Sequence, residues 1–205
     1  MNKLETERLI LREIQEDDFT AIHSYASCPE NVVYMQWGPN TEAQTRDFIN
    51  TSIKETVLDN PNKDYKFAAV LKDNGRVVGG CDIHVNGGEA SMGWILHRDY
   101  WKHGYGPEMG KALLKFGFDG LNLHRVIAKC DAENYGSYRV MEKIGMRREG
   151  LFIEGRPANK LTGLPGYISC LFLLPVGYTN ESPVQPPKNS VEEISFVNTW
   201  VKRNN

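Results

Sequence analysis

The sequence predicts a single α/β domain built around a mixed, mostly antiparallel twisted sheet with helices on both faces. Three observations lead to this class. Residues 65–96 contain three β-prone runs joined by tight turns, which is typical of an antiparallel meander. A strand, a helical run and another strand then follow between 90 and 130, an order that favours a right-handed parallel crossover. Finally, 205 residues with 40% hydrophobic side chains suffice for one sizeable core.

Each expected element has a local signal. Alternating apolar residues between turn residues predict strands, and capping residues before apolar residues at helical spacing predict helices. The expected strands, about six or seven of which form the sheet, are 8–12, 65–72, 76–85, 90–96, 125–130, 146–153 and 167–174. The expected helices run from Asp18 through Tyr25, from Thr41 to about 60, from the 101–108 turn to Gly120, and from Asn134 to Lys143.

Composition excludes several classes of function. A net charge of −2 and a pI near 6.2 leave no clustered basic surface for nucleic acid. No apolar run could span a bilayer, and the N-terminus has no secretory h-region. The four cysteines lack metal-ligand spacing, so neither a metal site nor a disulfide framework is expected. Scattered thiols of this kind suit a cytoplasmic protein.

The end of the chain differs from the rest. Residues 1–178 are expected to form the domain, and 179–205 a proline-rich linker followed by an amphipathic helix. Ser190 and Glu193 form a capping box at the start of that helix. Because a helix this short is marginal alone, its apolar stripe must dock. It could pack on its own core or on another subunit, which would give a homodimer.

The most informative segment is the turn Trp101-Lys102-His103-Gly104-Tyr105-Gly106-Pro107-Glu108, which follows a strand and opens a helix. Such a turn directs free backbone N–H groups and the positive end of a helix dipole at one small volume, which suits a phosphate or pyrophosphate. Pro107 fits the first helical turn because its missing N–H costs nothing there. The sequence therefore predicts an anion-binding loop.

The motifs together resemble the GNAT acyltransferases, and more closely the RimJ/RimL-like branch that acetylates the N-termini of ribosomal proteins. Trp-Lys-His-Gly-Tyr-Gly-Pro-Glu-Met at 101–109 is similar to the pyrophosphate loop of that branch. The opening 6–12 is similar to its first strand. Further matching residues are His124, Arg125, Ala128, Asn134, Ser137, Glu142, Lys143, Gly145, Met146, Glu149 and Gly150. The resemblance covers about residues 4–175.

The resemblance implies a GNAT fold in which the fourth and fifth expected strands, 90–96 and 125–130, splay apart. Acetyl-CoA would bind in that gap, its pantetheine pairing like an added strand and its pyrophosphate lying on the 103–108 turn. Asn134 would bond a pantetheine amide, and Ser137 would protonate the leaving thiolate. The cofactor residues implied in this way are Trp94, Ile95, Leu96, Lys102, His103, Gly104, Tyr105, Gly106, Pro107, Asn134, Ser137 and Lys143.

Several positions depart from the family pattern, among them His103, Pro107 and Met146, and two others bear on the chemistry. Met141 stands where many members carry a tyrosine that acts as the general acid, which moves the proton-donor role toward Ser137. Tyr167 stands where the branch often has an aspartate.

No spacing rule identifies the general base that would take a proton from the attacking amine. His97, just beyond the pantetheine strand, is the weakly preferred candidate, and Asp82, His84 and Asp99 are alternatives.

The function predicted from these residues is acetyl transfer from acetyl-CoA to a primary amine by direct attack in a ternary complex. The acceptor, a protein N-terminus or a small amine, carries no decisive motif. Two other functions remain open at this point. One is a non-catalytic acyl-CoA-binding sensor on the same fold. The other is an NAD(P)-binding oxidoreductase, suggested by Gly104, Gly106 and Gly110 with Asp131 after the next strand.

Overall fold

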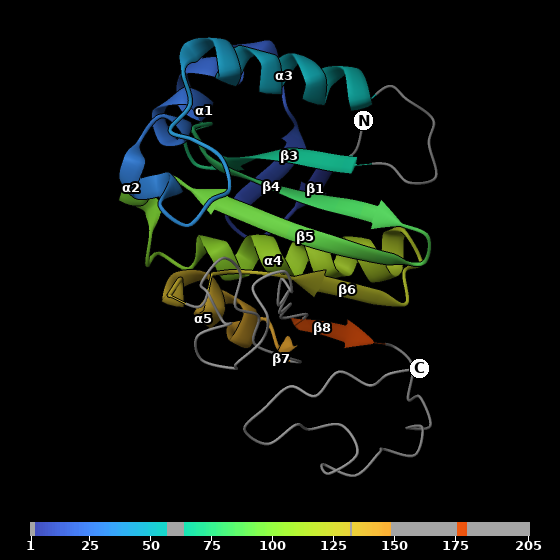
Figure 1. The fold of residues 1–205 in the computed structure, drawn as a ribbon. Helices are drawn as coiled ribbons and strands as arrows, with labels where there is room; N and C mark the ends of the chain where they lie inside the picture. The colour runs from blue at the N-terminus through green and yellow to red at the C-terminus, as the bar shows by residue number, and fades with distance from the viewer. Residues whose placement is uncertain (1–2, 57–63, 132, 149–175, 180–205) are drawn as a thin grey trace, which may run out of the picture.

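A computed structural model describes residues 3–56, 64–131, 133–148 and 176–179. Its described strands form one sheet in the order β1-β2-β3-β4-β5-β6-β8-β7 (Figure 1). Among these strands β5 and β6 pair in parallel, and every other neighbouring pair is antiparallel. The strands are β1 (Lys3–Glu5), β2 (Leu9–Glu13), β3 (Asp64–Leu71), β4 (Val77–Asn86), β5 (Glu89–Leu96), β6 (Arg125–Ala128), β7 (Arg147–Arg148) and β8 (Val176–Thr179).

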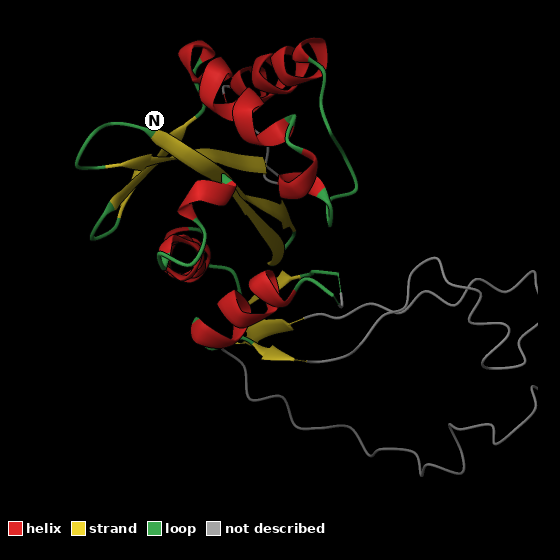
Figure 2. Cartoon of the chain, turned by 90° about the vertical axis from the view of Figure 1, so that its left-hand side faces the viewer, coloured by secondary structure: helices red, strands yellow, loops and turns green. Residues whose placement is uncertain are grey.

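Helices cover both faces of the sheet (Figures 1 and 2). α1 and α3 lie on one face, while α4 lies on the other with α5 packed beside it. The α-helices are α1 (Phe19–Ala26), α2 (Pro29–Val32), α3 (Glu42–Thr56), α4 (Tyr105–Lys115) and α5 (Tyr135–Lys143). Shorter 3-10 turns are Glu16–Asp18 and Arg98–Tyr100, and a π-helical turn, Phe116–Gly120, continues α4.

Strand alternation divides the buried side chains into two clusters. Cys81 and Ile83 of β4 point to the α4 side, where they join Met109 and Leu113 of that helix. On the opposite face the cluster is smaller and packs helices α1 and α3 against the sheet. Its buried members are Ile14, Ile22, Tyr25, Ala26, Ile49, Ala68 and Val70. The sheet is therefore a two-sided scaffold.

The caps predicted at Thr41, Asn134 and Gly145 are confirmed, whereas Asp18, the residue before α1, makes no side-chain cap bond to that helix. At the start of α3 the Thr41 N–H donates to Gln44 Oε1 at 2.8 Å, and the Gln44 N–H donates to Thr41 Oγ1 at 3.3 Å. At the start of α5 the Ser137 N–H donates to Asn134 Oδ1 at 3.0 Å. Gly145, with a φ of +86°, follows the end of α5 in the left-handed conformation expected there.

The mixed, mostly antiparallel sheet and the two helical layers confirm the predicted fold. Sequence reasoning did not foresee the short elements β1, α2 and β8, because three or four residues carry too little periodicity. Of the strand predicted at 146–153, the part that the structure describes contains β7. The predicted strand at 167–174 and the C-terminal helix lie outside the described residues, as does most of the predicted linker. In the described part of the chain, no helix combines the length and hydrophobicity needed to cross a membrane.

Candidate active site

The splay between β5 and β6 opens the site. Their parallel pairing ends at Met92 and Ala128, whereas β5 continues to Leu96. The His97 N–H donates to the Val78 C=O of β4, so by alternation Trp94 and Leu96 direct their backbone groups to the opposite edge. Trp94 thus presents its N–H and C=O beyond the end of the β6 ladder. An extended ligand could pair with this edge as an added strand.

Two side chains occupy the end of that edge. The Leu96 C=O accepts a hydrogen bond from Asn31 Nδ2 at 2.6 Å and another from Trp101 Nε1 at 2.8 Å. Asn31 is buried, and its Oδ1 also accepts the Arg98 N–H at 3.2 Å. These bonds satisfy the last carbonyl of β5 and turn the chain toward the glycine loop. A ligand pairing with β5 would therefore use Trp94 and the Leu96 N–H.

The glycine loop forms the N-terminus of α4. Gly104 is the residue before the helix, with a left-handed φ of +85°, and Lys102 is also left-handed at +64°. Residues with a Cβ are strained in this region, so the turn needs glycine at 104. The amides of Tyr105 and Gly106 stand in the first helical turn, where no intrahelical carbonyl can accept from them. The glycine turn with free N–H groups at the start of a helix is therefore present, and anion binding by these amides stays a prediction.

Charged and polar side chains from the start of the chain hold this loop in place. Arg8 Nε and Nη2 contact Glu108 Oε2 at 2.8 Å and 2.7 Å, and the Arg8 N–H donates to Oε1 at 2.7 Å. Thr6 Oγ1 donates to the same Oε1 at 2.6 Å, and Arg8 Nη1 donates to the His103 C=O at 2.9 Å. Burial acts to raise the pKa of Glu108, but the hydrogen bonds from Thr6 and Arg8 outweigh it and lower that pKa. We refer to Thr6, Arg8 and Glu108 as the brace.

A cavity of about 880 Å³ lies in front of the loop, between the end of β5 and α5. We call it the helix-end cavity. All the predicted cofactor residues line it except His103, whose ring lies outside the lining. Its cations are Lys102, Arg139 and Lys143, which could neutralise phosphate groups, and its carboxylates are Glu30 and Glu133. The size and the excess of positive charge fit a large anionic cofactor.

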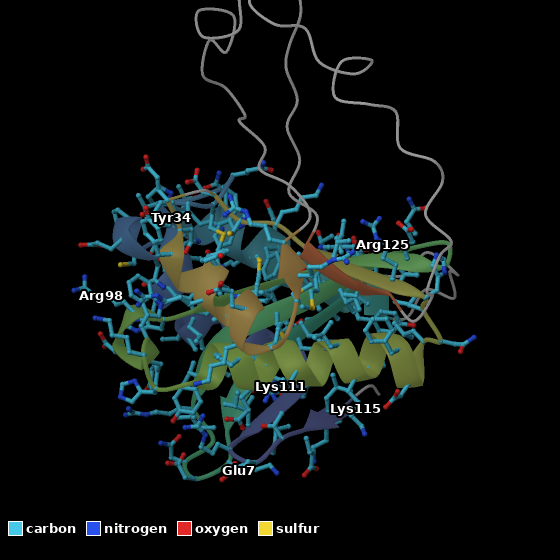
Figure 3. The ribbon with its side chains drawn as sticks, turned by 90° about the horizontal axis from the view of Figure 1, so that it is seen from below. Glu7, Tyr34, Arg98, Lys111, Lys115 and Arg125 are labelled. Atoms are coloured by element: carbon cyan, nitrogen blue, oxygen red, sulfur yellow. The ribbon has the colours of Figure 1, made fainter. Side chains whose placement is uncertain are left out.

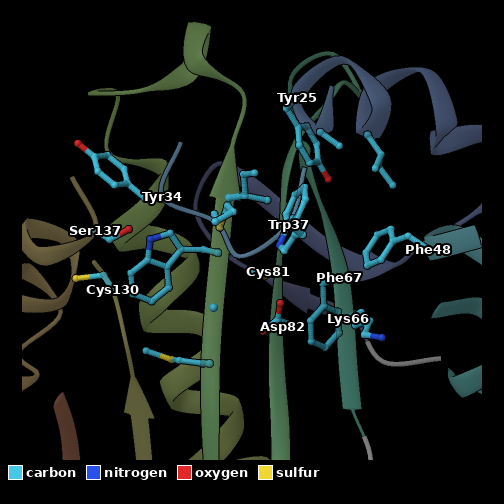
Figure 4. A pocket seen from close by; sticks show the side chains of 18 of the residues that line it. Tyr25, Tyr34, Trp37, Phe48, Lys66, Phe67, Cys81, Asp82, Cys130 and Ser137 are labelled. Atoms are coloured by element: carbon cyan, nitrogen blue, oxygen red, sulfur yellow. The ribbon is translucent and has the colours of Figure 1, made fainter. Parts of the chain in front are cut away.

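A second cavity, of about 490 Å³, lies on the α1 and α3 face of the sheet (Figure 4). We call it the aromatic cavity because the rings of Tyr25, Trp37 and Phe48 form much of its wall. Phe67 is also among the lining residues, but its ring lies on the opposite face of the sheet, against Phe116. The two cavities meet at the splay. The residues that line both are Tyr34, Met35, Trp94, Ile95, Asn134 and Ser137. We call this shared part the junction, and it offers a place where a group from each cavity could react.

Exposed apolar side chains mark the same region. Within the described residues, each large hydrophobic side chain that is exposed lines at least one of the two cavities. These side chains are Val33, Tyr34, Trp37, Phe48, Trp101 and Tyr135. Exposed apolar surface gathered around cavities is typical of ligand sites. Sequence reasoning missed this wall, because its members come from separate helices and loops.

Asp82 and His84 of β4 are the paired polar groups of the aromatic cavity. His84 Nε2 lies 3.2 Å from Asp82 Oδ1, and its Nδ1 lies 2.9 Å from Asp64 Oδ2. The hydrogen bond to Asp82 is the main cause that raises the pKa of His84 to about 9. His84 is therefore protonated at neutral pH and cannot serve as a base there. Gly93 faces Asp82 across the strands and leaves room for its carboxylate.

Of the two predicted catalytic residues, Ser137 lines both cavities, whereas His97 lies outside the lining of both. Its Nδ1 accepts the Asp99 N–H at 3.3 Å, and its ring packs edge-on against Tyr100.

Cys130 lines the aromatic cavity, where burial is the main cause that raises the pKa of its thiol. Met141 is buried in the core. Among the described residues, no cluster of His, Cys, Asp or Glu is placed to hold a metal ion.

Comparisons with known proteins agree with this geometry. The family model for the acetyltransferase (GNAT) domain matches residues 8–147. An uncharacterized N-acetyltransferase of Bacillus subtilis, YnaD, is 38% identical over 149 residues, which cover 72% of this chain and 84% of that protein. The crystal structure of a GNAT-family acetyltransferase from Bacillus anthracis superposes with a TM-score of 0.72 at 32% identity. The match covers 87% of this chain and 98% of that one.

A more distant structure shares the fold. Spermidine N-acetyltransferase from Vibrio cholerae, solved in complex with CoA and spermine, has a TM-score of 0.65 at 17% identity. The match covers 83% of this chain and 95% of that one.

The chain belongs to the GNAT family of acetyltransferases. It is an N-acetyltransferase. The alternative of an NAD(P)-binding oxidoreductase has no support in this fold. A dinucleotide fingerprint opens the first unit of a parallel sheet, whereas this glycine loop follows the last strand of an antiparallel series.

Proposed function

We propose that the protein transfers the acetyl group of acetyl-CoA to a primary amine that enters through the aromatic cavity. The observation that carries this proposal is the junction, where Ser137 and the Trp94 edge line both cavities. Acetyl-CoA would approach from the helix-end cavity and the amine from the other side. Holding both reactants in one ternary complex accounts for much of the rate enhancement such a site can deliver.

The described residues offer a partner for each part of the cofactor. The pyrophosphate would lie on the Tyr105 and Gly106 amides, where the helix dipole favours negative charge. The pantetheine arm would pair with the Trp94 edge. Asn134 uses its Oδ1 to accept the Ser137 N–H, so its Nδ2 can donate to a pantetheine carbonyl. Lys102, Arg139 and Lys143 would neutralise the remaining phosphate charge.

The reaction joins the amine nitrogen to the acetyl carbon and breaks the carbon–sulfur bond. The electron pair of that bond leaves on the CoA sulfur, to which the Ser137 hydroxyl would donate its proton. An ammonium acceptor loses one proton to solvent before the attack, because only the neutral amine is nucleophilic. The attacking nitrogen then loses a second proton, and Asp82 is better placed than His97 to accept it, because Asp82 lines the aromatic cavity. His84, held as a cation, would keep the Asp82 carboxylate in position. Ser137 would recover its proton from solvent, so the products are an amide and free CoA.

The test is CoA release by the full-length protein with acetyl-CoA and a panel of primary amines, followed by mass spectrometry of the products. Acetylated amine together with stoichiometric CoA supports the proposal. Tight CoA binding with no product from any amine would instead favour the acyl-CoA sensor. Absence of CoA binding in calorimetry would remove the site assignment altogether. Three further proposals rest on sequence patterns: the RimJ/RimL-like branch, the cytoplasmic location and a homodimer. A peptide with a free N-terminus in the amine panel tests the first of these, the branch.

A further inference from the structure

The walls of the aromatic cavity carry rings from three separate elements. Tyr25 comes from α1, Trp37 from the segment between α2 and α3, and Phe48 from α3 (Figure 4). Tyr25 is almost fully buried, whereas Trp37 and Phe48 are 43% and 39% exposed. Exposed rings that face a cavity can still gain contact with a ligand. The buried Tyr25 ring gives that ligand a rigid wall.

The charges of the cavity limit what it can hold. Asp82 is the one carboxylate among its described lining residues, and it already contacts the His84 cation. Lys66 and Lys129 add two further cations to the lining, and Lys66 Nζ is held by Glu55 at 2.6 Å. A ligand with a single ammonium group can approach Asp82. A polyamine would bring additional ammonium groups to a wall that offers no second carboxylate, so it is disfavoured.

Size and polarity also favour a small organic molecule. A cavity of about 490 Å³ falls within the range for small-molecule sites, about 300–1,000 Å³. Beyond Asp82 the wall offers rings at Trp37 and Phe48, which suit a hydrocarbon body. The amide groups of a peptide would lose hydrogen bonds to water against such rings. The junction with Ser137 fixes where the amine must lie, so the body extends toward Phe48.

We infer that the acceptor is an arylalkylamine, a primary amine with one ammonium group and an aromatic body. The inference rests on the proposed function, because it assigns the aromatic cavity to the acceptor. The amine lies at the junction within reach of Asp82, and the ring of the acceptor packs among Tyr25, Trp37 and Phe48. Aromatic pairs and ring–cation contacts both contribute to recognition in such a site.

The experiment measures CoA release by the full-length protein with acetyl-CoA and four acceptors. They are 2-phenylethylamine, ethylamine, spermidine and a peptide with a free N-terminal serine. We expect kcat/KM for 2-phenylethylamine to exceed that for ethylamine roughly hundredfold, since only the first fills the ring-lined wall. It should exceed the values for spermidine and the peptide as well. A higher kcat/KM for spermidine or the peptide overturns the inference while leaving acetyl transfer intact.

The variant Phe48→Ala tests the wall itself. It should lower kcat/KM for 2-phenylethylamine about tenfold and leave that for ethylamine nearly unchanged. Lys54→Ala, at an exposed position of the same helix outside the lining, should change neither value. An equal loss for both amines in Phe48→Ala would contradict the inference. If that variant does not fold, the ratio of the kcat/KM values for 2-phenylethylamine and ethylamine in the unmodified protein decides.

Failure of the proposed function has a different signature. If no amine releases CoA, acetyl transfer as proposed is wrong, and calorimetric titration with 2-phenylethylamine in the presence of CoA then decides the cavity assignment. Binding of 2-phenylethylamine that weakens about tenfold in Phe48→Ala would keep the aromatic cavity as an arylalkylamine site. No measurable binding would overturn it.

Discussion

Arg8 and Glu108 lie 100 positions apart in the chain, yet Arg8 Nη2 and Glu108 Oε2 are only 2.7 Å apart. The contact joins the residue before β2 to the first turn of α4, next to the glycine loop. Through the His103 C=O the same guanidinium also holds the loop backbone. The opening segment of the chain therefore positions the amides that we assign to the pyrophosphate, although it contributes no residue to the lining of the helix-end cavity.

Replacing Arg8 by alanine should weaken both the loop and cofactor binding. The partly buried Glu108 would lose its charged partner, at a cost of about 1–2 kcal/mol in the free energy of unfolding. We expect the Kd for CoA to rise up to about tenfold. Lys111→Ala, an exposed change on the same helix (Figure 3), is the control. Calorimetry and thermal unfolding measure both effects, and an unaltered Kd would show that the brace is only structural.

Gly104→Ala should be costly in the same loop. A φ of +85° is strained for alanine by about 1–2 kcal/mol. The added Cβ would also lie 3.3 Å from Arg8 Nη2, an atom that the ion pair with Glu108 restrains. We expect a lower Tm and weaker CoA binding. Gly75→Ala, also at a positive φ but with open space around its Cβ and outside the lining of both cavities, separates general strain from loss of the site. Comparable loss of CoA affinity in both variants would contradict this explanation.

Ser137→Ala should lower kcat with little change in the affinity for acetyl-CoA. The backbone N–H of Ser137 donates to the Asn134 side chain at the start of α5 and is retained in the variant, so this helix should stay capped. The hydroxyl that would protonate the leaving thiolate is lost. General acid catalysis is worth about 10²–10⁴-fold, and we expect a loss in kcat toward the lower end. Steady-state kinetics and a CoA titration measure the two quantities, and an unchanged kcat would remove Ser137 from the mechanism.

His84 should make stability depend on pH above neutrality. Its pKa is raised from 6.5 to about 9 in the folded state, so its contribution is fully present below pH 6.5 and is lost as the pH rises through 9. The side chain is 44% exposed, and after solvent screening we expect on the order of 1 kcal/mol.

The measurement compares Tm for the unmodified protein and His84→Gln at pH 6 and at pH 9.5. The Tm difference between the two proteins should be larger at pH 6 and shrink at pH 9.5. Equal differences at both pH values would mean that the ion pairs with Asp64 and Asp82 add nothing measurable.

Much of the fold could be predicted because its signals are local. The turn at 101–108, the capping box of Thr41 and Gln44, and the alternation in β3 to β5 each lie within a few residues. The brace and the Asn31 bond to the Leu96 C=O could not be predicted in this way, because their partners are 65 to 102 positions apart. The resemblance of residues 6–12 to a family motif was the one available signal for Arg8, and it did not reveal its partner.

The sequence by itself determined the order of the elements, the glycine loop at the start of α4 and the cofactor class that the loop would accept. Those properties depend on backbone geometry, capping and residue spacing, which neighbouring residues decide. Only the tertiary structure decided that two cavities meet at Ser137, that Asp82 rather than His97 faces one of them, and that aromatic rings from three elements form its wall. Strand register and the packing of helices on opposite faces bring such residues together, and neither leaves a periodic pattern in the chain.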